Sequence, residues 1–203
     1  IAYKVGYDVP SSLSISFKQQ YGISPLDYRN NKDFRIMRSL KDNISLNIKG
    51  PKIMDIPTKK AIYIKLMGPY NSLDFSGTWQ RLWQFVKENK LFSFGMEHIA
   101  IYYDDPKVTE EEKLRTDLCL IIKKDAKPQG EVGVKEINGG KFAMFLYRGP
   151  YDNLDAVYDT IYSKLLPESN LRLRNNHGFE KYLNHPGETK PEKLKTEIYI
   201  AVE

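Results

Sequence analysis

The stretch that decides the fold occurs twice: Gly68-Pro69-Tyr70 returns 81 positions later as Gly149-Pro150-Tyr151. A longer segment repeats in the same order, because Tyr102-Tyr103-Asp104-Asp105-Pro106 returns 80 positions later as Tyr182-Leu183-Asn184-His185-Pro186. One three-residue match can arise by chance, but ordered matches at a near-constant spacing indicate an internal duplication. We therefore expect two parts of the chain to fold alike.

A third match gives the extent of the two copies. Glu112-Lys113-Leu114-Arg115-Thr116-Asp117 returns as Glu192-Lys193-Leu194-Lys195-Thr196-Glu197, again 80 positions later. We interpret residues 51–203 as two copies of one unit, 51–123 and 132–203. Each unit is too long for a solenoid repeat and suits a supersecondary module paired with its duplicate.

Both copies show the same order of elements, which is strand, strand, helix, strand, strand. Alternating β-branched and aromatic residues indicate the strands, and Gly-Pro ends the second strand because proline cannot donate to a ladder. The predicted strands are 52–56, 61–67, 99–103 and 118–122, followed by 134–137, 142–148, 179–183 and 198–202. Apolar residues at helical spacing mark one helix in each copy, with Trp79, Leu82, Trp83 and Val86 in the first and Tyr158, Ile161, Tyr162 and Leu165 in the second. The predicted fold class is α+β, with helices on one face of an antiparallel sheet.

Residues 1–29 precede this domain and are predicted to be all-α. Pro10–Tyr21 is expected to be a helix, because proline suits the first helical turn and Gly22 suits the residue after the last. Short helical segments are expected before it, in 1–7, and after it, in 25–29. A helix, a tight turn and a second helix form a possible DNA-reading unit.

The charge of the chain is distributed unevenly. Its 203 residues include 31 basic and 26 acidic side chains, which gives a net charge of +5. Eight of the basic and four of the acidic residues lie in 1–50, so this quarter holds most of the excess. Such asymmetry indicates either contact between one segment and a polyanion or a solvated basic segment.

Several function classes are excluded by what the sequence lacks. Cys119 is the single cysteine, which rules out a disulfide framework and a cysteine-based zinc cluster. The three histidines share no metal-ligand spacing, and the chain has no Gly-rich phosphate loop and no nucleophile elbow. No apolar run approaches the roughly 20 residues that span a bilayer. We therefore expect a cytoplasmic protein with no cofactor, metal, catalytic residue or membrane partner.

One position breaks the duplication at a charge. Glu180, in the strand 179–183, corresponds to Ala100 in the first copy and shares its strand face with Tyr182. Glutamate is a poor strand former and is seldom buried unpaired. A carboxylate beside tyrosine rings suits recognition of a cation, with cation–π attraction of ~0.5–2 kcal/mol per ring. The alternative is an exposed glutamate on the solvated face of the sheet.

These motifs carry a resemblance to known families. Residues 1–29 resemble the second helix-turn-helix of AraC-type transcriptional regulators, and 51–203 resemble the GyrI-like effector-binding domain, so that 30–50 form a linker. The matching motifs are Val5-Gly6-Tyr7, Phe17-Lys18, Tyr21-Gly22-Ile23-Ser24-Pro25, the two Gly-Pro-Tyr turns and Phe179-Glu180-Lys181-Tyr182-Leu183. The sequence contains neither a starting Met nor the first helix-turn-helix of the AraC-type pair. Under this resemblance we expect an N-terminally truncated regulator.

The resemblance implies a ligand-responsive regulator of transcription that binds a lipophilic, often cationic, small-molecule effector between the two repeats. Glu180 matches the acidic residue that contacts the cation. The tyrosines implied to line the cleft are Tyr199, Tyr182, Tyr102 and Tyr63.

The resemblance also implies a DNA-binding role for the helix Pro10–Tyr21, which matches the recognition helix. The residues available to DNA are Ser11, Ser12, Ser14 and Lys18. Ile15 departs from the family pattern, since relatives often carry a basic residue there. Because half of the expected phosphate contacts are absent, we expect DNA to be a partner of the full-length protein and this chain to bind it weakly or not at all.

Two other function classes stay open at this point. The first is a small-molecule hydrolase, in which Glu180 positions water as a general base beside a tyrosine. The second is a protein-interaction module without a ligand, in which Glu180 lies on a flat, solvated sheet face. We expect ligand binding rather than enzymatic activity.

Overall fold

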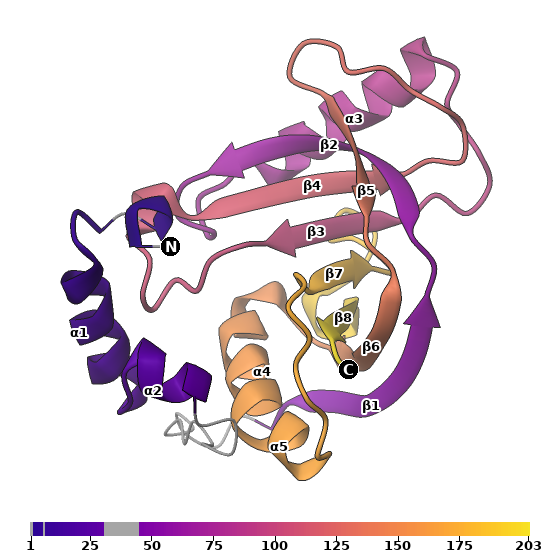
Figure 1. Cartoon of the computed structure of the whole chain (residues 1–203). Helices are drawn as coiled ribbons and strands as arrows, with labels where there is room; N and C mark the ends of the chain where they lie inside the picture. Colours follow the sequence, from indigo (N-terminus) through magenta and orange to yellow (C-terminus); the bar gives the residue numbers. More distant parts are fainter. Residues whose placement is uncertain (1, 6, 31–44) are drawn as a thin grey trace.

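The computed structural model describes residues 2–5, 7–30 and 45–203 and has the predicted α+β fold (Figure 1). Within these residues, eight strands form one antiparallel sheet in the order β1-β6-β8-β7-β3-β4-β2-β5. The strands are β1 (Asn47–Ile56), β2 (Lys59–Met67), β3 (His98–Tyr102), β4 (Arg115–Ile121), β5 (Gly133–Ile137), β6 (Gly140–Arg148), β7 (Phe179–Tyr182) and β8 (Lys195–Ala201). The α-helices are α1 (Pro10–Tyr21), α2 (Pro25–Asn30), α3 (Phe75–Glu88), α4 (Leu154–Thr160) and α5 (Leu166–Glu168), with a π-helical turn, Ile161–Leu165, between the last two.

Each predicted strand is present, with small differences at the ends. β1 is the exception in length, because it begins at Asn47 and not at the predicted residue 52. Its first residues therefore lie in the 30–50 range expected to be a linker. Residues 31–44 of that range lie outside the described residues.

The first strand of each copy joins the sheet of the other copy. β1 pairs with β6, with Met54 opposite Phe142, and β5 pairs with β2, with Lys135 opposite Ala61. The two copies also meet in the middle of the sheet, where β3 pairs with β7. Separating the copies would therefore break three ladders of hydrogen bonds, so they form one domain.

Equivalent residues face each other at the centre of the sheet. Ala100 of β3 and Glu180 of β7 lie 80 positions apart in the sequence and are direct partners in the ladder. This pairing places a local two-fold axis between them. Any side chain at either position lies beside its own counterpart from the other copy.

Both main helices cover the same face of the sheet, over different halves of it (Figure 1). Ala100, Glu180 and Ile198 are cross-strand neighbours and so point to one face. Leu82 of α3 packs in the cluster that contains Ala100, and Val157 of α4 packs in the cluster that contains Ile198. Each such buried aliphatic side chain contributes roughly 1.5–3 kcal/mol to folding.

The opposite face of the sheet carries a separate core. Ile99, Phe179 and Tyr199 cluster there with Ile56 of β1 and Ile137 of β5. β1 and β5 are the two edge strands of the sheet. Because both edges contribute to one cluster, the sheet curves strongly around this core.

The N-terminal helices lie beside the loop that follows β3 (Figure 1). α1 has the predicted bounds, and Gly22 ends it with a left-handed φ of 73° and an amide that donates to the carbonyl of Lys18. The Tyr7 hydroxyl donates to the carbonyl of Val108, and the Tyr21 hydroxyl donates to the Asp105 carboxylate. These contacts join the helical segment to the first copy. None of the described helices is long and apolar enough to cross a membrane.

Candidate functional site

Glu180 is buried at the centre of the helix-covered face, with 1% of its surface exposed. Oε1 accepts a hydrogen bond of 2.9 Å from the Tyr158 hydroxyl of α4, and Oε2 accepts one of 2.8 Å from the Tyr182 hydroxyl. Among the described residues, no lysine, arginine or histidine forms an ion pair with this carboxylate. A buried carboxylate without a cationic partner is costly, so its presence here points to a functional reason.

Tyrosines from both copies meet beside Glu180 across the local two-fold axis. The hydroxyls of Tyr102 and its counterpart Tyr182 are 3.0 Å apart. The ring of Tyr70 contacts that of Tyr102 at 4.9 Å between centroids, and the ring of Tyr151 contacts that of Tyr182 at 5.5 Å. The two Gly-Pro-Tyr turns thus supply an equivalent ring to each side of the site.

The helices complete this arrangement with one aromatic residue each. Trp79 of α3 meets Tyr182 edge to face at 6.5 Å between centroids. Tyr158 of α4 corresponds to Trp79 in the repeat and reaches the Glu180 carboxylate directly. We call the following six residues the aromatic shell: Tyr70, Trp79, Tyr102, Tyr151, Tyr158 and Tyr182.

Burial dominates the protonation of the site. It raises the pKa of the Glu180 carboxyl to about 7, against the two phenol hydrogen bonds, which lower it. Burial, and then the charge of Glu180, raise the pKa of Tyr102, Tyr158 and Tyr182 well above the ordinary value. The phenols are therefore neutral hydrogen-bond donors at neutral pH, while Glu180 exchanges its proton near neutrality.

The local two-fold axis explains why one copy carries the acid and the other does not. Ala100 is fully buried directly opposite Glu180. Two carboxylates at these positions would be adjacent in a low-dielectric interior, where one of them must stay protonated. The methyl group of Ala100 leaves a single ionisable group at the centre of an otherwise symmetric shell.

Two buried hydroxyl groups on the same face have no hydrogen-bond partner within the described part of the chain. Thr116 lies opposite Tyr102 and Thr196 lies opposite Tyr182, so each shares a face with a shell tyrosine. Both are fully buried, and neither hydroxyl has a hydrogen-bond partner among the described residues. An unsatisfied buried hydroxyl costs about 1–3 kcal/mol. Thr116 and Thr196 are equivalent in the repeat and supply two further polar groups at the edges of the shell.

The structure places the five predicted effector-binding residues on two faces. Tyr102 and Tyr182 lie with Glu180, whereas Tyr199 and Tyr63 belong to the core on the opposite face. The prediction that Tyr199 and Tyr63 share a cleft with Glu180 is therefore wrong in this structure. The physical reason is register, because Tyr199 pairs with Phe179 while Glu180 pairs with Ile198, and side chains alternate along a strand.

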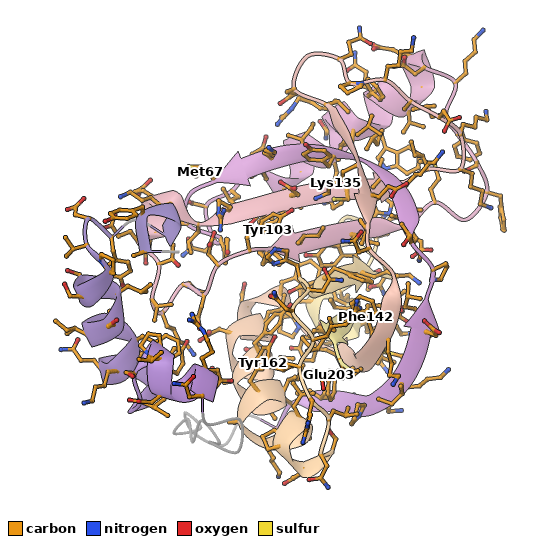
Figure 2. All side chains as sticks on the ribbon, in the orientation of Figure 1. Met67, Tyr103, Lys135, Phe142, Tyr162 and Glu203 are labelled. Atoms are coloured by element: carbon orange, nitrogen blue, oxygen red, sulfur yellow. The ribbon has the colours of Figure 1, made fainter. Side chains whose placement is uncertain are left out.

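The two misplaced tyrosines make other contacts. Tyr199 stacks on Phe179 at 4.5 Å between centroids and donates to Glu197 at 2.8 Å. The ring of Tyr63 lies under the ammonium group of Lys135 of β5, at 4.7 Å. Figure 2 shows Lys135 close to Tyr103 on this side of the sheet, and the two side chains hydrogen-bond at 3.0 Å.

Four shell residues were not predicted as site residues. The sequence pattern assigns Trp79 and Tyr158 to apolar helix faces, and Tyr70 and Tyr151 only to the repeated turns. The sequence does contain an indication, because in both turns tyrosine follows Gly-Pro and in α4 a residue with a hydroxyl stands where α3 has Trp79. A polar aromatic residue that recurs at the equivalent position of both copies marks a site better than the same residue in one copy.

The predicted DNA-contacting residues lie on one short helix. Ser11, Ser12 and Lys18 of α1 are exposed, and the Ser14 hydroxyl donates to the carbonyl of Pro10 at 3.1 Å. Ile15, which departs from the family pattern, is also exposed on this helix. The structure thus leaves three of the four predicted side chains accessible, and DNA contact by them stays a prediction.

The duplicated sheet and its buried, shell-enclosed carboxylate define a small-molecule-binding domain of the α+β class. The chain belongs to the GyrI-like family, described as a small molecule binding domain, whose family model matches residues 50–203.

Relatives and solved structures agree with this assignment. The DNA gyrase inhibitor of Escherichia coli (strain K12) is 29% identical over 141 residues, which cover 68% of this chain and 87% of that protein. The EcmrR chain of a cryo-EM EcmrR–DNA complex has a TM-score of 0.61 at 16% identity, covering 95% of this chain and 66% of that chain. SAV2435 bound to tetraphenylphosphonium has a TM-score of 0.50 at 15% identity, covering 75% of this chain and 93% of that chain. At these identities the two structures show a shared fold.

Proposed function

We propose that the domain 50–203 binds a lipophilic cation on the helix-covered face, between the two repeats, with Glu180 as its counter-ion. The observation that carries this proposal is a buried carboxylate that has two phenol donors and no cationic partner among the described residues. An organic cation supplies the missing charge, and the rings around it supply cation–π attraction of ~0.5–2 kcal/mol each. The tetraphenylphosphonium in SAV2435 supports this ligand class.

Binding requires the shell to open. Glu180 is 1% exposed, so a bulky ligand must displace shell rings to reach it. Tyr158 is well placed for this movement, because it approaches Glu180 from α4, whereas Tyr102 and Tyr182 lie on central strands. The free energy of binding therefore equals the free energy gained from the new ion pair and ring contacts minus the free energy needed to open the shell.

We propose binding without turnover. Both Glu180 oxygens accept a hydrogen bond from a phenol, which favours a counter-ion over a general base. A hydrolase would consume an electrophilic substrate, and its activity would disappear in Glu180→Ala. Binding of the cation with no loss of ligand over many protein equivalents supports the proposal, and ligand consumption contradicts it.

We further propose that effector binding alters DNA binding by the N-terminal segment 1–29, which resembles an AraC-type helix-turn-helix. A chain of contacts supports this coupling. Asp159 follows Tyr158 on α4 and pairs with Lys107 at 2.6 Å, and Lys107 shares its loop with Asp105, which Tyr21 of α1 contacts. Movement of Tyr158 on ligand entry would reach α1 through this loop. A ligand shifts DNA affinity only by its difference in affinity for the two states.

The experiment is a titration with tetraphenylphosphonium at pH 8, read from tryptophan fluorescence, because Trp79 belongs to the shell. Wild type should bind, and Glu180→Gln should bind at least tenfold more weakly. The matched control is Glu197→Gln, since Glu197 also accepts a phenol hydrogen bond but lies on the opposite face. Equal affinities of wild type and Glu180→Gln would refute the site.

A further inference from the structure

A hollow surface lies at one end of the sheet, and the Tyr151 hydroxyl of the aromatic shell donates to the carbonyl of Asn184 in its lining. Two adjoining hollows, of about 210 and 450 Å³, both include Arg148 at the end of β6 and Lys195 at the start of β8. We call them together the basic groove. Its charged residues are Lys49, Arg148, Lys190, Lys193 and Lys195, with Glu188 as the single acid.

The cations of the basic groove are placed against each other. Arg148 and Lys195 are direct cross-strand partners, an arrangement that destabilises a sheet when both residues carry the same charge. All five are exposed and none pairs with an acid among the described residues, while Glu188 lies 3.5 Å from His185. An anion in the groove would relieve this repulsion.

The internal duplication provides an independent observation. The loop after β7, which lines the groove, folds like the loop after β3: the Thr189 amide donates to His185 at 3.1 Å, as the Thr109 amide donates to Asp105 at 3.0 Å. In the first copy the N-terminal helices dock on this loop, where Tyr7 contacts Val108 and Tyr21 contacts Asp105. The equivalent loop of the second copy lines the open basic groove.

The two equivalent loops differ in charge, which indicates different partners. The loop after β3 carries Asp104, whose side chain is buried and paired with Arg115, and Asp105, which contacts Tyr21. The loop after β7 has Asn184 and His185 at these positions, and the groove that it lines carries five cations and one acid. A second copy of the N-terminal segment is disfavoured there, since residues 1–50 carry eight basic and four acidic side chains. The excess of cations in the groove favours an anionic partner.

The composition of the groove distinguishes between anionic partners. Four of its five cations are lysines, and no aromatic residue lines it. Protein interfaces are depleted in lysine and anchored by aromatic residues and arginine. Several spaced lysines in a shallow groove suit instead the regular charges of a phosphate backbone. We propose that the basic groove binds the phosphate backbone of duplex DNA, independently of base sequence.

The test uses the whole chain and a fluorescent 20-base-pair duplex of arbitrary sequence, with anisotropy measured from 50 to 200 mM NaCl. The variant combines Arg148→Gln, Lys193→Gln and Lys195→Gln. The plot of log affinity against log salt should lose about 2 to 3 units of slope, and affinity at 100 mM NaCl should fall at least tenfold. Thermal unfolding and tetraphenylphosphonium binding should match wild type, which separates this result from failure of the effector site.

The control removes the same charge elsewhere, by Lys87→Gln, Lys127→Gln and Lys164→Gln, three exposed lysines with no ion pair among the described residues. The proposal requires this control to keep a slope close to that of wild type. Equal losses in the two triple variants would mean that only net charge matters and would overturn the proposal. Absence of duplex binding by wild type at 50 mM NaCl, or preference of the groove for polyglutamate over the duplex, would also overturn it.

Discussion

Cation binding at Glu180 should depend on pH in a way that the structure makes quantitative. Burial raises the pKa of this carboxyl to about 7, so the free protein holds a proton there below neutrality. An organic cation needs the ionised form, and it must displace that proton to bind. The affinity for tetraphenylphosphonium should therefore rise with pH up to about 7 and level off above it.

The size of the effect follows from the same pKa. At pH 5, two units below the pKa, about one site in a hundred is ionised, so affinity should be about 100-fold weaker than at pH 8. This factor corresponds to about 2.7 kcal/mol. Glu180→Gln has no proton to displace, and its weaker binding should not change over the same range.

The assay is the fluorescence titration at pH 5, 6, 7 and 8, with Glu197→Gln as the control that should follow wild type. The reasoning is refuted by a wild-type affinity that is constant across this range. It is equally refuted by a Glu180→Gln variant with the wild-type pH profile, because another group would then be titrating.

Three other outcomes are expected. Tyr158→Phe removes one hydrogen bond to the ionised carboxylate, which is worth about 1.5–3 kcal/mol. The midpoint of the pH profile of binding should therefore move up by about one to two pH units. An unchanged midpoint contradicts this. Ala100→Glu places a second acid opposite Glu180, so urea unfolding at pH 8 should show about 3 kcal/mol less stability than the matched Ala100→Gln; equal stabilities would contradict the two-fold pairing. The pKa of Glu180 is about 7 in the folded protein and 4.5 in the unfolded chain, so proton binding at Glu180 favours the fold. This contribution to stability is complete below pH 4.5 and is lost as the pH rises through 7. Wild type should therefore lose about 3 kcal/mol relative to Glu180→Gln between pH 4.5 and 7, and parallel curves would refute this.

The sequence predicts the elements of this fold well, because local patterns determine them. The repeated Gly-Pro-Tyr turns give the duplication, and Pro10 and Gly22 give the bounds of α1. The exchange of β1 and β5 between the copies could not be predicted. Both strands follow the expected pattern, and only tertiary pairing decides which sheet each one joins.

The site was predicted in part for a related reason. The alternation of side chains along a strand places Glu180 and Tyr182 on the same face. It does not say which residues of the neighbouring strand share that face. The pairing of Phe179 with Tyr199 decides this, and it puts Tyr199 on the other face. Tyr158 was missed because its position fits an apolar helix face, and its hydroxyl gains meaning only when Glu180 lies within 2.9 Å.

The central claim is that Glu180 is the counter-ion of a bound organic cation. Its most direct test is a carbon-13 NMR titration of the Glu180 carboxyl, assigned by its absence in Glu180→Gln, with and without saturating tetraphenylphosphonium. We predict a midpoint near pH 7 in the free protein and one below about 4.5, the ordinary value, when the cation is bound. The same midpoint in both samples would contradict the claim.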